Sequence, residues 1–246
     1  MAAVKIGHAS CDEYGRASGG KAGDQTGREV CVRDWYRGNW NIVLRPKSSD
    51  VAEKMAAFCE AGCNNPKVGY DQGQRNTLRA AAREAGWQGA KIARSCETDC
   101  SAFMTVCAEA AGVNVSYTWG NAPTTWTMRG LFMSTGAFNV LMDNKYLTTD
   151  KYLKRGDILV RESGHTAMAL SNGDFSGVGT ASYTSQAAGT VKDEPTETEY
   201  TVIQGDTLWG IAVRYHVTVP AICEANGIDS RGFIYPGQKI KIPQGG

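Results

Sequence analysis

Apolar residues recur at helical spacing in four segments between residues 49 and 136. From Ser49, apolar residues three and four positions apart predict a helix with Ser49 or Asp50 as its N-cap, ending before Asn64-Asn65-Pro66. The same spacing predicts helices over residues 74–86, from about residue 98 to 112, and over 124–136.

The spacing of apolar residues changes after Gly156-Asp157. Residues 158–160 (ILV) and 165–170 (HTAMAL) are short apolar runs next to a Ser-Asn-Gly turn, which is typical of strands, and residues 40–44 also resemble a strand. Helices followed by a small antiparallel sheet predict an α+β fold for residues 1–176. Residues 177–198 are small, polar and non-periodic, so we expect a linker there.

The last segment, residues 199–244, is predicted to form a β-α-α-β unit. The stretches YTVIQGDTLWGIA, ICEANGI and IYPGQKIKIP resemble a LysM domain along its full length. That resemblance implies binding of N-acetylglucosamine-containing glycan in a shallow groove. The groove residues it implies are Gly205, Asp206, Thr207, Leu208, Asn226, Gly227, Ile228 and Asp229. The alternative to glycan binding is that the polar residues of this set serve only as helix caps and turn formers. One shallow site binds weakly, so it would mainly raise the local concentration of enzyme at the wall.

Composition excludes several partner classes. The 246 residues are 42% hydrophobic and 21% charged with a net charge of +1, which gives no reason to expect nucleic acid or an anionic membrane as partner. No apolar run is long enough to span a membrane, and the N-terminus lacks the apolar core of a signal peptide. We therefore expect synthesis in the cytoplasm, with any action outside the cell requiring lysis or dedicated export.

The chain has eight cysteines, three of them in the stretch CETDCSAFMTVC. They could be disulfide halves, metal ligands, buried apolar residues or a nucleophile. Neither Cys59-x3-Cys63 nor Cys96-x3-Cys100 has the further ligands that a zinc site needs, so we expect no metal and mostly reduced, buried thiols.

Cys100 differs from its neighbours because it follows Asp99 at the start of a predicted helix. The free N–H groups and the positive dipole end there favour a thiolate, whereas Cys107 should be buried two turns further on. A base is also needed. Of three histidines, His216 falls in the C-terminal unit, which leaves His8 and His165. From the residues alone, both remain candidates, as does simple core packing.

The motifs DCSAF, RGDILV and GHTAMALSNG occur in that order, and His165 follows Cys100 by 65 positions. In these motifs and their order the chain resembles cell-wall papain-like peptidases of the NlpC family and its CHAP relatives. That resemblance implies a papain-like domain of helices packed on a small antiparallel sheet. It further implies Cys100 as nucleophile, His165 as base, and Asp99 and Ser101 on the substrate side. The residue that orients the histidine is missing at its usual place, near Ser176 and Gly177. Asp174 is our candidate, Asn172 is another, and the fold could recruit one from elsewhere.

The N-terminal stretch precedes the usual start of such a domain, and the whole order of segments resembles phage endolysins. We expect His8, Asp24 and Gln25 near the substrate cleft, although Asp24 could simply cap a Gly-rich loop. Aromatic side chains could stack on sugar rings, but core packing is the better expectation for them. They are Trp35, Tyr36, Trp40 and Trp87.

Together these features predict a peptidoglycan hydrolase that cuts an amide bond of the stem peptide by Cys-His catalysis without a cofactor. It would be a cysteine endopeptidase or an N-acetylmuramoyl-L-alanine amidase. The alternative is a non-catalytic wall-binding or virion protein with a degenerate hydrolase domain, which the missing third residue favours. The sequence leaves open which bond is cut and the oligomeric state.

Overall fold

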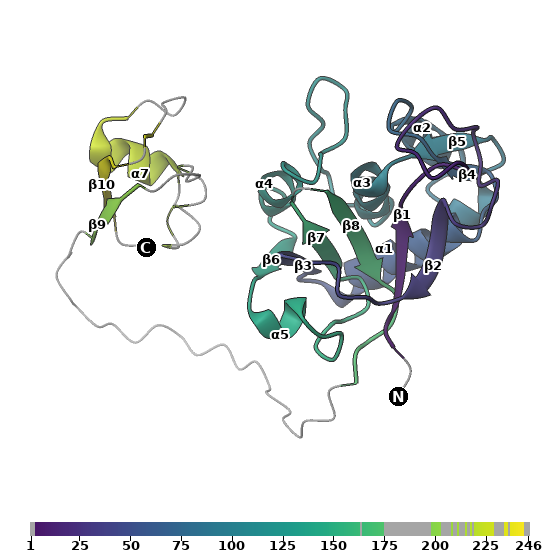
Figure 1. Cartoon of the computed structure of the whole chain (residues 1–246). Coiled ribbons are helices and arrows are strands. Elements are labelled where there is room, and N and C mark those ends of the chain that lie inside the picture. The colour runs from purple at the N-terminus through teal and green to yellow at the C-terminus, as the bar shows by residue number, and fades with distance from the viewer. Residues whose placement is uncertain are drawn as a thin grey trace. The chain divides into compact units, whose positions relative to one another are not determined.

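The structure is a computed structural model (Figure 1). It describes residues 3–162, 164–174 and 198–202, and from the C-terminal part residues 208, 211, 215, 217, 219–228, 234–235 and 237–243. The chain divides into two compact units, Met1–Gly179 and Thr180–Gly246, which are treated separately below. The predicted linker 177–198 lies outside the described residues except for its last residue.

A six-stranded antiparallel sheet forms the centre of the first unit, with strand order β2-β1-β8-β7-β3-β6 (Figure 1). Its strands are β1 (Lys5–Ala9), β2 (Val30–Asp34), β3 (Ile42–Pro46), β6 (Phe138–Leu141), β7 (Ile158–Arg161) and β8 (His165–Ala169). The N-terminal strand β1 therefore lies between β2 and the late strand β8. It pairs Gly7 with Met168, residues far apart in the sequence.

The helical segments of the first unit include four that lie close to where the sequence predicts them, and a 3-10 turn and a last short helix that were not predicted. They are α1 (Ser49–Cys63), α2 (Thr77–Glu84), a 3-10 turn (Gly89–Lys91), α3 (Cys100–Ala110), α4 (Met128–Met133) and α5 (Asn144–Leu147). The N-cap of α1 is Ser48, one residue before the predicted cap, and its side chain accepts from the Val51 N–H. The helical order and small antiparallel sheet confirm the α+β prediction.

Alternating strand residues build two separate cores. Ile42, Leu44 and Met168 face the main core, which α1, α2, α3 and α4 complete. Val43 and Ala167 face a smaller core on the other side, closed by Trp40 and by partly buried residues near α5. The sheet is thus covered on both faces, and burial of its apolar side chains stabilises the unit.

The RGD motif before β7 has a structural function. Gly156 has φ +91°, and a Cβ there would lie 2.7 Å from Ala52 of α1, so glycine is required. The buried Asp157 carboxylate accepts two hydrogen bonds from Arg45 of β3, at 2.8 and 2.6 Å. Arg155 forms ion pairs with Glu53 and Glu60 of α1. The motif therefore joins β7, β3 and α1.

A second sheet carries the segment before α3. The parallel strands β4 (Val68–Tyr70) and β5 (Cys96–Thr98) pair, and the backbone of the loop containing Gly23 contacts Gly69 so closely that a Cβ would not fit. The Gly-rich N-terminal stretch is in this way packed on β4, which pairs with β5, the strand directly before α3.

In the second unit, β9 (Thr198–Thr201) pairs antiparallel with β10 (Lys239–Ile242), and α7 (Val219–Asn226) packs on them. Ile222, Ile240 and Ile242 belong to its small core. The second helix and last strand confirm the prediction. Most residues of the predicted first helix lie outside the described residues.

Candidate active site

Helix α3 begins at Cys100, and Asp99 is its N-cap. The Asp99 carboxylate accepts from the Ala102 N–H at 2.7 Å and from the Ser101 hydroxyl at 3.1 Å. This is the cap that the sequence predicts for an Asp before an apolar helical segment. The cap fixes the Cys100 side chain at the first position of the helix, on a helix that packs against β8 and β1.

Arg75 fixes the same helix start from the other side. Its guanidinium lies 2.6 Å from the Asp99 carboxylate and donates to the Ser101 hydroxyl at 2.8 Å. It also donates to the carbonyls of Ala122 and Pro123. Asp99 and Ser101 are buried, with internal partners, so they position the helix start. This differs from the expectation that they face the substrate.

His8 and His165 lie side by side on the neighbouring strands β1 and β8. The Nδ1 of His8 is 3.0 Å from the Nε2 of His165, and the two rings meet edge to face with centroids 5.2 Å apart. His8 is 3% exposed. The structure therefore supplies a polar partner for His165 from the start of the chain. The sequence alone gave no signal for this pairing, because it depends on β1 lying next to β8.

Trp40 covers His165. Its ring is stacked on the imidazole with centroids 6.0 Å apart and an interplanar angle of 30°, and its indole N–H donates to the Tyr36 carbonyl. Trp40 is buried in the smaller core, and Trp35 and Tyr36 pack partly buried against it. Trp87 packs against the main core. These placements agree with core packing of the four aromatic residues.

Cys100 approaches β8 next to His165. The backbone N–H of Thr166 donates toward the Cys100 sulfur, and so does the N–H of Ser101. In the part of the chain that the structure describes, no hydrogen bond joins the thiol to the imidazole itself. Because the Nε2 of His165 faces His8, Nδ1 is the ring nitrogen left for a proton from Cys100.

Burial sets the protonation states of the three groups. Burial, together with the negative charge of Asp99, raises the pKa of the Cys100 thiol to about 12. Burial lowers the pKa of His165 to about 4 and that of His8 to about 3, with nearby arginines such as Arg33 acting in the same direction. At neutral pH the resting site therefore holds a thiol and two neutral imidazoles. The predicted thiolate is not favoured, because desolvation outweighs the backbone N–H groups at the helix start.

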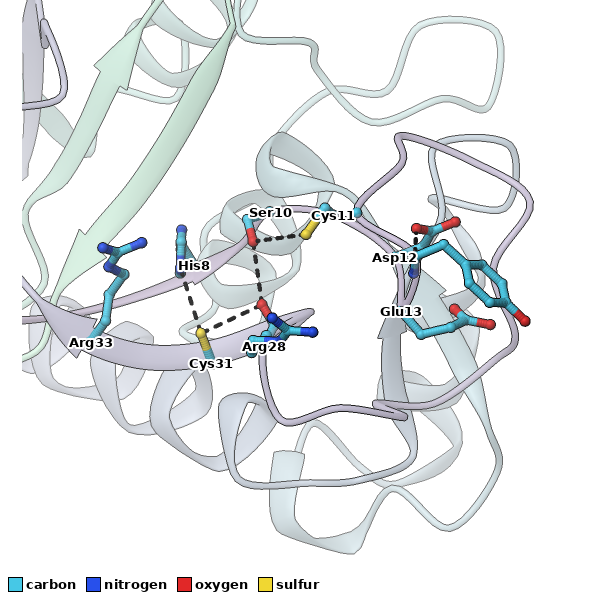
Figure 2. Close-up of a pocket in the computed structure, with 10 residues that line it drawn as sticks. His8, Ser10, Cys11, Asp12, Glu13, Arg28, Cys31 and Arg33 are labelled. Atoms are coloured by element: carbon cyan, nitrogen blue, oxygen red, sulfur yellow. Dashed lines mark hydrogen bonds between the residues drawn. The ribbon is translucent and has the colours of Figure 1, made fainter.

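A pocket of about 600 Å³ opens beside His8 (Figure 2). It is lined by His8, Ser10, Cys11, Asp12, Glu13, Tyr14, Gly15, Arg28, Cys31 and Arg33. Arg28 and Arg33 are exposed and basic, whereas the Asp12 carboxylate is buried and accepts from the N–H groups of Tyr14 and Arg16. The expectation that His8 lies near a cleft agrees with this placement.

Asp24 and Gln25 do not line this pocket. The Asp24 carboxylate accepts from the N–H groups of Thr26 and Gly27, and the Gln25 amide donates to the carbonyls of Ala22 and Gly23. Both side chains therefore stabilise their own loop. These contacts support the loop-cap alternative, and the expectation that the two residues lie near the substrate cleft stays a prediction.

No hydrogen bond joins Asp174 to His165 among the residues that the structure describes. Asp174 is exposed and lies five residues beyond the end of β8, whereas His165 begins that strand. Its neighbour Asn172 accepts from the Arg155 N–H in the adjoining turn. Ser176 and Gly177 lie outside the described residues. The expectation assumed that the orienting residue follows β8 in the sequence, whereas the strands beside β8 in the sheet are β1 and β7.

The other thiols of the first unit also have defined places. The cysteines within residues 3–174 are all free. Cys59 and Cys107 are buried in the main core, and burial raises the pKa of Cys59 well above its ordinary value. Cys96 is buried at the start of β5. No group of three or more metal-ligating side chains occurs among the described residues.

The described LysM residues mostly serve the fold. Leu208 is buried in the small core and Ile228 packs against it. The Asn226 amide donates to the carbonyls of Ile222 and Lys241 and accepts from the Lys241 N–H, which joins α7 to β10. Gly227 follows the helix at φ +61°. The remaining predicted groove residues, Gly205, Asp206, Thr207 and Asp229, lie outside the described residues.

Residues 6–176 match the endolysin-like domain family, and residues 200–243 match the LysM domain. The chain belongs to the endolysin-like domain family. The family match spans the sheet, the helices and both histidines of the site. The LysM match confirms the predicted C-terminal module.

Curated relatives share shorter stretches with this endolysin-like chain. N-acetylmuramoyl-L-alanine amidase sle1 of Staphylococcus epidermidis is 43% identical over 70 residues, which is 28% of this chain and 20% of that protein. A probable N-acetylmuramidase of Lactococcus lactis is 51% identical over 45 residues, 18% of this chain and 10% of that protein. The chain thus spans at most a fifth of the length of these relatives. No solved structure gives a significant match.

The described residues include no helix long and apolar enough to cross a membrane.

Proposed function

We propose that the chain is a peptidoglycan hydrolase in which Cys100, His165 and His8 cleave an amide bond of the stem peptide. The observation that carries this proposal is the His8–His165 contact on adjacent strands, beside the start of the helix that bears Cys100. A thiol at a helix start, a histidine and a polar partner for that histidine are the parts that acyl transfer by a cysteine requires.

In the proposed reaction the Cys100 sulfur attacks the amide carbonyl while its proton passes to Nδ1 of His165. Because both groups are neutral at rest, proton transfer accompanies the attack. A side-chain rotation must first bring the thiol and imidazole together, as is common when substrate binds. Backbone N–H groups at the start of α3 stabilise the oxyanion. His165 then protonates the leaving amine, and a water that it activates releases the acid product and the thiol.

His8 has the role that the sequence left unassigned. It accepts at Nδ1 from the Nε2–H of His165, which fixes the ring and stabilises the imidazolium formed during attack. Its lowered pKa keeps it neutral, so it can accept this hydrogen bond at pH 7. This replaces the earlier alternative in which His8 itself is the base for Cys100.

The LysM domain is proposed to hold the enzyme on the glycan of the same wall. The names of the relatives, an amidase and a probable muramidase, describe proteins that act on peptidoglycan. Between these two activities, a Cys–His site favours amide cleavage, because glycosidases typically use a pair of carboxylates.

The test is lysis of purified cell walls with mass spectrometry of the released fragments. Cys100→Ala should abolish release while wall sedimentation of the variant stays at the wild-type level. Full lysis by Cys100→Ala would refute the mechanism. Wild-type protein that binds walls but releases no fragment from several wall chemotypes would favour the non-catalytic alternative, for which the burial of Cys100 is the supporting observation.

A further inference from the structure

Cys31 of β2 lies on the far side of His8 from His165. Strands β1 and β2 pair His8 directly with Cys31, and the Cys31 sulfur is 3.5 Å from the Nε2 of His8. The same sulfur lies 3.6 Å from the Arg28 carbonyl oxygen. Figure 2 shows Cys31 between these two partners, at the wall of the pocket.

One arrangement of the hydrogen atoms makes both contacts of the Cys31 sulfur hydrogen bonds at once. The Arg28 carbonyl can only accept, so the Cys31 S–H donates to it. The sulfur then accepts from the Nε2–H of His8. His8 is neutral, so its Nδ1 carries no hydrogen and accepts from His165.

The same series of hydrogen bonds determines which ring nitrogen of His165 can accept the proton of Cys100. Since His165 donates through Nε2, its Nδ1 is the unprotonated nitrogen that can take the proton of Cys100. If His8 instead carried its hydrogen on Nδ1, His165 would have to accept at Nε2. It would then hold its own hydrogen on Nδ1, where it could not act as a base.

We propose that Cys31 is a positioning residue that selects the Nε2–H tautomer of His8 and thereby keeps His165 ready to accept a proton. This proposal rests on the proposed function, in which His165 is the base. Cys31 does not touch the reacting atoms, and it acts only through His8.

The first measurement is nitrogen NMR of the histidine rings in the full-length protein labelled with ¹⁵N. The chain has three histidines, so the two ring nitrogens of each must be assigned to a residue. Protonated and unprotonated ring nitrogens resonate far apart, which identifies the tautomer directly. In the wild type at pH 7, His8 should carry hydrogen on Nε2. In Cys31→Ala a measurable fraction should move to Nδ1.

The second measurement is the kinetics of amide cleavage by the same variants. Loss of one hydrogen bond to a neutral ring predicts a decrease in kcat of about 5- to 10-fold for Cys31→Ala, with KM nearly unchanged. Cys31→Ser keeps a group that both donates and accepts, so it should stay within about 3-fold of the wild type. Cys11→Ala is the matched control, because it removes a thiol of the same pocket whose hydrogen-bond partner is Ser10.

Three outcomes would overturn the proposal. They are an Nδ1–H tautomer of His8 in the wild type, an unchanged tautomer in Cys31→Ala, and an unchanged kcat in that variant. Cys31→Ala could instead be as inactive as Cys100→Ala, and iodoacetamide could modify Cys31 first. Together these two results would identify Cys31 as the nucleophile. Failure of the proposed function would be distinguishable, because Cys100→Ala would then remain active while the NMR result on His8 still stood.

Discussion

Glu97, three residues before Cys100, is a buried carboxyl whose ionisation lowers the free energy of unfolding, and a single substitution can remove this effect. Its side chain is 0% exposed, and neither carboxylate oxygen accepts a hydrogen bond from any residue that the structure describes. Burial, together with the neighbouring carboxylates of Asp71 and Glu29, raises the pKa of this carboxyl to about 8. An unfolded chain would ionise the same group near 4.5.

The sign of the effect follows from this raised pKa. The folded state holds a proton that the unfolded state releases, so the free energy of unfolding falls as pH rises from about 4.5 to about 8 and is constant above. The two pKa values give a cost of about 1 kcal/mol at pH 5, about 3 at pH 7 and about 5 at pH 9, as upper limits. Glu97→Gln removes this cost and replaces it by that of a buried amide, which is roughly 1 to 3 kcal/mol and independent of pH.

The assay is urea unfolding of Glu97→Gln and wild type at pH 5, 7 and 9, followed by tryptophan fluorescence. Relative to the wild type, the variant should gain about 4 kcal/mol between pH 5 and pH 9. Glu84→Gln is the control, because Glu84 is an exposed glutamate of α2 paired with Arg94 at the surface, and it should show no such trend. A stability difference for Glu97→Gln that stays constant from pH 5 to 9 would refute the reasoning.

Two further predictions concern the site and a loop. The rate of cleavage of a soluble muropeptide should fall at acid pH with an apparent pKa near 4, that of His165, and stay constant up to pH 9, because Cys100 and His165 are both neutral at rest. A decline of the rate at alkaline pH below 9 would instead indicate a thiolate–imidazolium pair. Trp119 is 95% exposed and has φ +52°, a left-handed conformation that Asn tolerates better than Trp. Trp119→Asn should therefore raise the free energy of unfolding, measured in urea, by about 1 kcal/mol. A loss of stability would show that the indole makes stabilising contacts despite its exposure.

Local sequence determined most of the helices and their caps. Asp99 before an apolar helical segment predicted both the start of α3 and the position of Cys100, because capping depends only on residues within one turn. The apolar runs of β7 and β8 and the LysM module were equally recognisable. These features depend on residues that are close together in the chain, so the sequence pattern is enough to predict them.

Only the tertiary structure decided the partners of the site. Strand β1 was not predicted, and its insertion beside β8 brings His8 to His165 across 157 positions of sequence. The same arrangement places Cys31 behind His8. Burial was equally invisible in the sequence, and it keeps Cys100 a thiol where the helix start alone favours a thiolate. Strand order and desolvation depend on the whole packed unit, whereas capping and periodicity depend on neighbours in the chain.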